Sequence, residues 1–140
     1  MLLVIGTDDA LLEGLAQSLA ANGRRVATCQ TIDEAVQIAE REAPLLLLVD
    51  RALLGPTTEG TLGRVPVSTG GALVTYRSTG TVGGALSLPP ALSRLQIADL
   101  ELPLERNRLL ALAERLDARA RLAGRDRGAR PPEPPAPESA

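Results

Sequence analysis

The sequence predicts an α/β fold in which helices cover both faces of a parallel β-sheet. Two observations support this prediction. Short apolar runs alternate with amphipathic segments over residues 1–122, and the run 45–49 is apolar at every position, which is typical of a strand that is covered on both faces. Strands that alternate with helices along a chain form parallel sheets with crossover connections.

The first fifty residues contain the clearest elements. An apolar run precedes a helix whose apolar residues recur every three or four positions, and Asn22-Gly23 closes that helix. After a second strand, Thr31 and Glu34 form a capping box that opens the next helix, and Pro44 ends it. The predicted strands are 2–5, 25–29 and 45–50, and the predicted helices are 9–22 and 32–43.

The second half of the chain is less regular. Residues 55–71 contain five glycines and two prolines and leave room for one helical turn, so the fold is expected to be partly degenerate there. Residues 123–140 contain many prolines and few large apolar side chains, which predicts a disordered tail after a domain that spans 1–122. The predicted strands here are 72–76 and 97–102, and the predicted helices are 59–64, 91–95 and 104–124.

The composition excludes several kinds of catalytic site. The chain has no histidine, all fifteen basic residues are arginines, and Cys29 and Tyr76 are its only cysteine and its only aromatic residue. This excludes histidine acid–base chemistry, Schiff-base lysines, a P-loop and an internal disulfide. A zinc site would need carboxylates alone. We therefore expect no zinc site.

The charge and hydropathy pattern bears on partners and location. The net charge is −2, so nucleic acid is not an obvious partner. No apolar window is long enough for a transmembrane helix, and the apolar start lacks the basic flank and cleavage site of a signal peptide. We expect a cytoplasmic protein that binds neither membranes nor nucleic acid.

The five predicted strands indicate a flavodoxin-like sheet with strand order 2-1-3-4-5. In such sheets the functional site lies at the carboxyl ends of the strands. The residues at those ends are Gly6, Thr7, Asp8 and Asp9 after the first strand, Asp50 after the third, Thr75 or Ser78 after the fourth, and Leu102 and Pro103 after the fifth.

This arrangement resembles the receiver domain of two-component response regulators. The resemblance covers residues 1–122 and is strongest in three segments: Val4 to Val26, Leu45 to Gly55 and Ala98 to Glu105. It implies that Asp50 holds the position of the phosphate-accepting aspartate. It also implies that Thr75, or Ser78 if the strand is longer, is the hydroxyl that ends strand four.

The sequence also departs from the receiver pattern. The places of the family's two metal-binding acids fall on Gly6 and Thr7. Leu102 stands where the family has lysine, although Pro103 matches the proline after it. The next carboxylates, Asp8 and Asp9, are better placed to cap a helix than to bind a metal ion. The chain is therefore interpreted as a degenerate receiver, or pseudo-receiver.

The resemblance and these departures together imply a signalling or regulatory module that docks to a protein partner, is not phosphorylated, is not an enzyme and has no cofactor. One alternative is a phospho-accepting receiver in a phosphorelay, with Mg²⁺ held by Asp8, Asp9 and Asp50. A second is a nucleotide-binding Rossmann-like module. The partner is not identified by the sequence. A homodimer through the face between strand four and the last helix is one interpretation, with apolar residues at Val82, Leu86, Leu88, Leu92 and Leu95.

Overall fold

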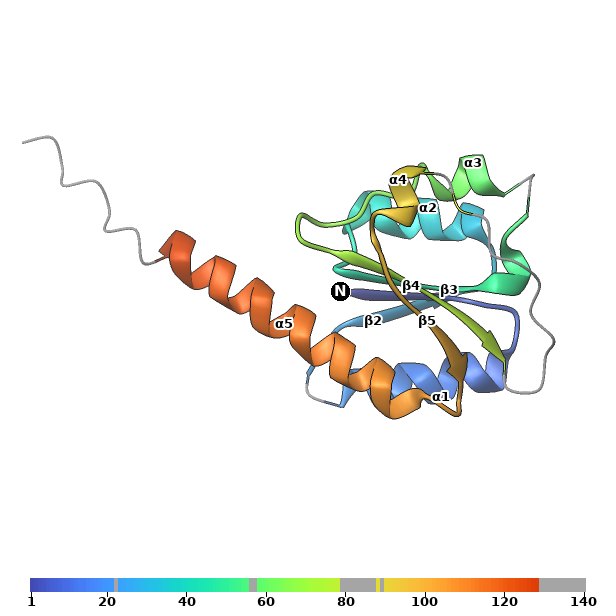
Figure 1. The fold of residues 1–140 in the computed structure, drawn as a ribbon, viewed down its shortest axis with the longest axis horizontal. Helices are drawn as coiled ribbons and strands as arrows, with labels where there is room; N and C mark the ends of the chain where they lie inside the picture. The colour runs from blue at the N-terminus through green and yellow to red at the C-terminus, as the bar shows by residue number, and fades with distance from the viewer. Residues whose placement is uncertain (22, 56–57, 79–87, 89, 129–140) are drawn as a thin grey trace, which may run out of the picture.

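The computed structural model describes residues 1–140 except 22, 56–57, 79–87, 89 and 129–140, and it contains five strands that alternate with helices (Figure 1). The elements in chain order are β1 (Leu2–Ile5), α1 (Asp9–Ala20), β2 (Val26–Cys29), α2 (Ile32–Arg41), β3 (Leu46–Asp50), the 3-10 turn η1 (Arg51–Leu53), α3 (Glu59–Leu62), β4 (Ala72–Ser78), α4 (Pro90–Ser93), β5 (Gln96–Leu102) and α5 (Arg106–Gly128).

The five strands form one parallel sheet in the order β2-β1-β3-β4-β5. This confirms the predicted strand order. Helices α1 and α5 cover one face of the sheet, and α2, α3 and α4 cover the other (Figure 1). The molecule is therefore a three-layer α/β sandwich of the flavodoxin-like type.

The central strands β1 and β3 are buried along their whole length. Side chains alternate along β3, so Leu46 and Leu48 pack toward α1 and α5, whereas Leu47 and Val49 pack toward α2, α3 and α4. A strand with helices on both sides must be apolar at every position. This explains why the run from Leu45 to Val49 has no polar residue.

Helices α1 and α2 begin at the caps that the sequence predicts. The Oδ1 atom of Asp8 accepts a hydrogen bond from the N–H of Leu11 at 3.1 Å and so opens α1. The Oγ1 atom of Thr31 accepts from the N–H of Glu34 at 3.2 Å and opens α2. These bonds supply acceptors for N–H groups that lack a partner within the helix.

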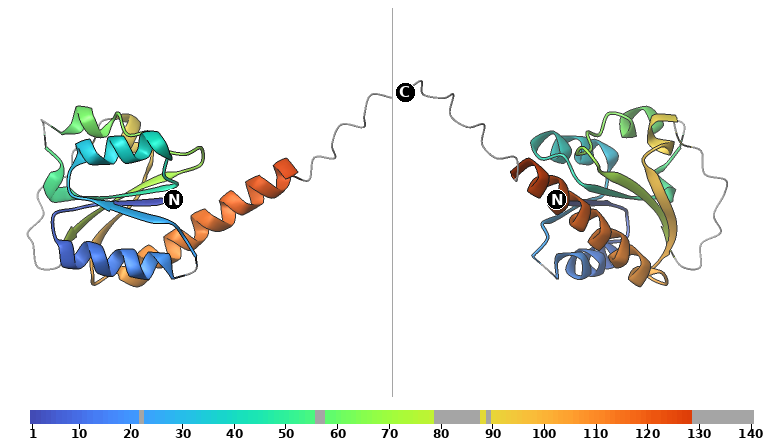
Figure 2. Two further views of the ribbon diagram at one scale, coloured as in Figure 1. Left: turned by 180° about the vertical axis from the view of Figure 1, so that it is seen from behind. Right: turned by 60° about the vertical axis from the view of Figure 1, so that its left-hand side comes forward.

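The last helix is longer than the sequence predicts. The pattern places its end at Gly124, yet the helix continues to Gly128, because a single glycine lowers helix stability by only about 1 kcal/mol and no proline intervenes. Residues 118–123 are all exposed, and the helix extends past the edge of the sheet (Figure 2). The rest of the expected tail, 129–140, lies outside the described residues.

None of the described helices combines the length and the apolar character that a membrane span requires.

The apolar residues near α4 belong largely to the core. Leu92 is buried, and Leu88 and Leu95 pack against the same cluster as α2 and α3. Leu92 is therefore a core residue. Leu88 and Leu95 are only partly buried, so the expectation that they contribute to a partner surface stays a prediction. Val82 and Leu86 lie outside the described residues.

We predict that Leu47→Ala lowers the free energy of unfolding by about 2–5 kcal/mol, because it leaves a cavity in a strand that is packed on both faces. Ile97→Ala is the matched control, since Ile97 is 46% exposed on the edge strand β5, and it should cost less than about 1 kcal/mol. Urea unfolding measures both values. Equal losses in the two variants would contradict the described burial of β3.

Candidate functional site

Asp50 lies at the carboxyl end of the central strand β3, where the sequence predicts the site. Its side chain is largely buried, with 6% of the residue exposed. The Oδ1 atom accepts a hydrogen bond from the N–H of Ala52 at 2.9 Å, so the carboxylate caps η1. Asp50 thus has a local structural role at the position where the sequence predicts the phospho-acceptor.

Tyr76, which the sequence analysis does not assign to the site, lies beside Asp50. The two residues are register partners in the pairing of β3 with β4. The Tyr76 ring is completely buried, and its hydroxyl donates a hydrogen bond to the carbonyl of Ile5 at 3.4 Å. Burial raises the pKa of Tyr76 well above its usual value, and the nearby carboxylates of Asp50 and Asp8 raise it further. The phenol is therefore neutral at the acidic edge of the sheet.

Gly6 and Thr7, which the sequence comparison with the receiver pattern predicts at the places of the metal-binding acids, directly follow β1. Gly6 is buried, and its N–H donates to the carbonyl of Cys29 at 3.1 Å. Thr7 is exposed. A Cβ atom on Gly6 would lie 2.1 Å from the hydroxyl oxygen of Tyr76. The space next to Gly6 is thus already occupied by the end of the phenol.

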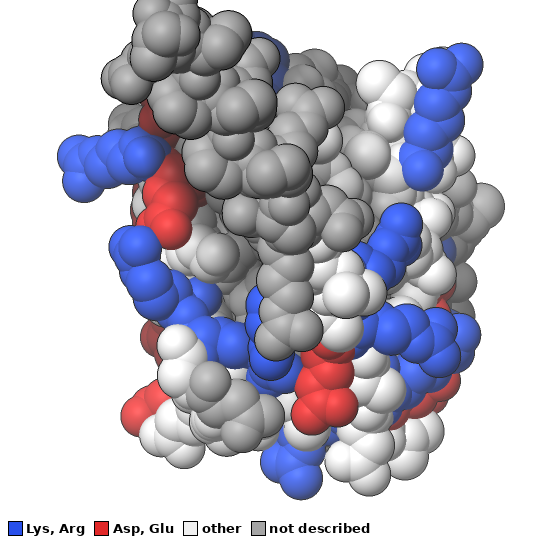
Figure 3. Space-filling view, turned by 90° about the vertical axis from the view of Figure 1, so that its left-hand side faces the viewer, with Lys and Arg blue, Asp and Glu red and all other residues white. Residues whose placement is uncertain are grey.

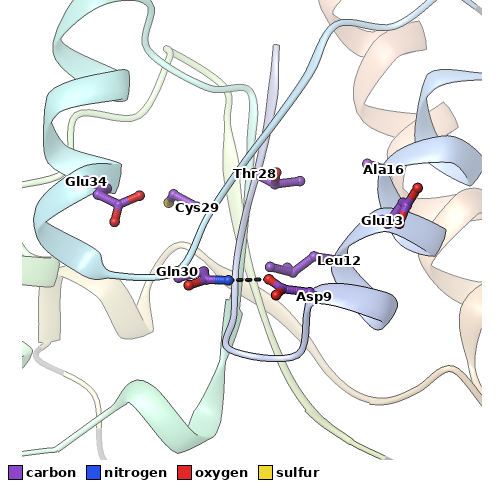
Figure 4. Close-up of a pocket in the computed structure, with 8 residues that line it drawn as sticks. All are labelled: Asp9, Leu12, Glu13, Ala16, Thr28, Cys29, Gln30 and Glu34. Atoms are coloured by element: carbon purple, nitrogen blue, oxygen red, sulfur yellow. Dashed lines mark hydrogen bonds between the residues drawn. The ribbon is translucent and has the colours of Figure 1, made fainter.

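Asp8 and Asp9 have structural partners. Asp8 caps α1, and Asp9 accepts a hydrogen bond from the side-chain amide of Gln30 (Figure 4). Among the described residues, no three His, Cys, Asp or Glu side chains are placed to hold a metal ion. The donor set of Asp8, Asp9 and Asp50 therefore does not fit the Mg²⁺ ion that the receiver fold implies.

Strand β4 continues to Ser78, so Ser78 rather than Thr75 ends it. Thr75 lies within the strand and is completely buried. Its hydroxyl donates to Asp99 Oδ1 at 2.7 Å and accepts from Gln96 Nε2 at 2.8 Å. Because neighbouring side chains in a strand point to opposite faces, Thr75 points away from the face that Tyr76 and Asp50 share.

The two residues at the end of β5, Leu102 and Pro103, are uncharged. Leu102, at the position where the resemblance predicts the family's lysine, is completely buried in the core beside α1 and α5. Pro103 follows it through a cis peptide bond. Arg51 follows Asp50 in the chain and forms an ion pair with Asp99, in which Arg51 Nη1 lies 3.1 Å from Asp99 Oδ2.

A separate pocket of about 380 Å³ lies between α1 and β2 (Figure 4). Three carboxylates line it, those of Asp9, Glu13 and Glu34, and none of its eight lining residues is basic. Such a surface repels phosphate groups, which does not favour the nucleotide-binding interpretation. Cys29 also borders the pocket, but burial, followed by the charge of Glu34, raises its pKa to about 11, so the thiol is not activated.

The opposite edge of the sheet carries arginines. The helices of a parallel α/β sandwich end at the amino-terminal edge of the sheet, and Arg41, Arg64 and Arg94 lie in or just after the last turns of α2, α3 and α4. Figure 3 shows basic side chains over this edge. Arginine at helix C-termini complements the helix dipole. Aspartate at helix N-termini does the same at the carboxyl-terminal edge of the sheet, which carries Asp50 and is called the site edge below.

Solved structures share this fold, although no model of a protein family and no curated protein matches the sequence. The receiver domain of NtrX from Brucella abortus aligns with a TM-score of 0.59 and 22% identity, covering 83% of this chain and 97% of that one. The signal receiver domain of a LuxO repressor protein from Vibrio parahaemolyticus aligns with a TM-score of 0.63 and 20% identity, covering 88% and 93%.

A larger NtrX chain from Brucella abortus, determined in complex with ADP, aligns with a TM-score of 0.61 and 21% identity. The alignment covers 91% of this chain and 28% of that one. The chain thus spans little more than a quarter of the larger protein. Together these likenesses show that the chain has the receiver-domain fold.

We predict that Asp50→Ala lowers the free energy of unfolding by about 1 kcal/mol, because it removes the acceptor that caps η1. Asp50→Asn keeps a side-chain oxygen at the same place and should change stability by less than about 0.5 kcal/mol. Chemical unfolding of the two variants measures the difference. If both variants lose the same stability, the carboxylate is not held by the capping bond.

Proposed function

We propose that this chain is a receiver-fold signalling module that is not an enzyme, does not accept a phosphoryl group on Asp50 and acts by docking to a protein partner. The observation that carries the proposal is the make-up of the site edge. Asp50 is retained at the end of β3, but Gly6, Thr7 and Leu102 stand where receivers have two acids and a lysine. The fold supports the signalling class, and the altered edge supports the loss of phosphorylation.

Phosphorylation of a carboxylate requires its negative charge and that of the incoming phosphoryl group to be neutralised. A divalent cation held by neighbouring acids supplies most of this charge. Here position 6 has no side chain, Asp8 is occupied in capping α1, and Leu102 is buried without charge. The negative charge of a phosphoryl group on Asp50 would therefore lie at an acidic edge, with little positive charge to balance it.

The half of the molecule from β4 to α5 supports a docking role. Strand β5 is an edge strand, since it pairs with β4 alone, and edge strands offer unpaired backbone groups to a second chain. Among the described residues, the large apolar side chains that are exposed are Ile97 at 46%, Leu104 at 70% and Leu122 at 58%. All three belong to this half, which favours a second copy of the chain as the first partner to test.

We predict that incubation with acetyl phosphate and Mg²⁺ leaves the intact mass of the protein unchanged, because the edge beside Asp50 lacks the acids and the lysine that would balance the phosphoryl charge. Mass spectrometry of the intact chain measures this, with Asp50→Asn as the control. A mass increase of one phosphoryl group in the native chain that is absent from Asp50→Asn would show that the chain is a phospho-accepting receiver.

We predict that Ile97→Glu and Leu104→Glu each weaken self-association by at least about tenfold, because they place a charge at an apolar contact. The melting temperature should stay within a few degrees, since both side chains are exposed. Sedimentation velocity over a concentration series measures association. Ala10→Glu adds the same charge to an exposed position on α1 and should have no effect.

The docking face is contradicted if the two β5-side variants associate as the native chain does. It is also contradicted if the native chain remains a monomer at several hundred micromolar and the same variants do not weaken binding to any protein partner that co-purifies with it.

A further inference from the structure

The contact between Gly6 and Tyr76 couples two positions at the site edge. Gly6 follows β1, and Tyr76 lies in β4, two strands away across β3. The Tyr76 ring reaches across the end of β3 on the face covered by α1 and α5, so its hydroxyl meets the backbone at Ile5 and Gly6. Two positions that are far apart in the sequence are thus in direct contact.

The geometry leaves no room for a side chain at position 6. A Cβ atom there would lie 2.1 Å from the Tyr76 hydroxyl oxygen and 3.2 Å from Leu12 Cδ2. The phenol cannot easily move aside, because its ring is completely buried and protein cores are close-packed. As long as Tyr76 keeps this position, any side chain at position 6 clashes with the phenol.

We infer that the Tyr76 phenol occupies the place of the carboxylate that a receiver would use at position 6 to bind a divalent cation. The pair of Gly6 and Tyr76 thus closes the metal site from inside the protein. Restoring an acid at position 6 is not sufficient to restore the site, because the phenol must also be removed.

Core packing alone does not require a tyrosine here. The other large residues of the same core cluster are aliphatic, and Tyr76 is the only aromatic residue of the chain. Within the described part of the chain, its hydroxyl makes one long hydrogen bond, to Ile5 at 3.4 Å. A buried hydroxyl contributes little stability through so long a bond. Stability therefore does not explain why the Tyr76 hydroxyl lies against Gly6.

This inference rests on the proposed function and deepens it. With the cation site closed by a side chain of the core, the docking surface is not linked to Mg²⁺ or to a phosphodonor.

A double-mutant cycle tests the contact. Gly6→Ala should lower the melting temperature by about 5–15 °C, as expected for an overpacked core. In the Tyr76→Phe background the hydroxyl is gone and the nearest ring carbon would lie 3.4 Å from the new Cβ, so the same substitution should cost less than half as much. Gly14→Ala is the matched control, since nothing lies within 4 Å of a Cβ there, and it should not lower the melting temperature.

Equal losses for Gly6→Ala in the two backgrounds, or failure of the Gly6→Ala/Tyr76→Phe variant to fold, would overturn the inference, because the conflict would then not lie with the hydroxyl. A loss in Gly14→Ala as large as that in Gly6→Ala would overturn it as well. Thermal unfolding followed by circular dichroism measures the native chain and all of these variants.

A Mg²⁺ titration followed by amide NMR tests the metal site itself. The native chain and Gly6→Asp should show no saturating shifts at low-millimolar Mg²⁺, whereas Gly6→Asp/Tyr76→Leu should show them at positions 6 and 50. Saturable binding by the native chain, or the same response in Gly6→Asp with and without Tyr76→Leu, would overturn the inference.

The two proposals can fail separately. If the thermal cycle shows no coupling while Asp50 stays unphosphorylated, the proposed function stands and the closed metal site is wrong. If Asp50 is phosphorylated by acetyl phosphate while the coupling is present, the phenol contact is real but the proposed loss of phosphorylation is wrong.

Discussion

Burial of β1 and β3 on both faces is the constraint on which the rest of the structure depends. These strands lie in the middle of the sheet, and their side chains alternate between the two core clusters. Each face must then be covered, by α1 and α5 on one side and by α2, α3 and α4 on the other. Because the strands are all parallel, they end at one edge of the sheet, and that edge collects the polar residues of the site.

The alternation of side chains also decides which residues meet at that edge. Asp50 and Tyr76 are register partners on the face of α1 and α5, whereas Thr75 points to the opposite face and bonds to Asp99. A shift of one residue along β4 would exchange these roles. The phenol therefore reaches Gly6, and the threonine hydroxyl does not reach Asp50.

Much of the site edge could be predicted from local patterns. Asp50 ends an apolar strand, and Asp8 precedes an amphipathic helix, so both positions follow from short stretches of sequence. Tyr76 could not be assigned in this way, because its role depends on contact with Gly6 across two strand pairings. The signal present in the sequence was the single aromatic residue in an aliphatic chain together with a glycine at the place of an acid.

The sequence by itself determined the order of the elements, the parallel sheet and the caps of α1 and α2, because these depend on the period of apolar residues and on contacts within a few positions. Only the tertiary structure decided that β4 continues to Ser78, that Leu88 and Leu95 pack against the core, and that the phenol of Tyr76 fills the space beside Gly6. These outcomes depend on packing between segments that are distant in the chain, and packing is not encoded in any one of the segments alone.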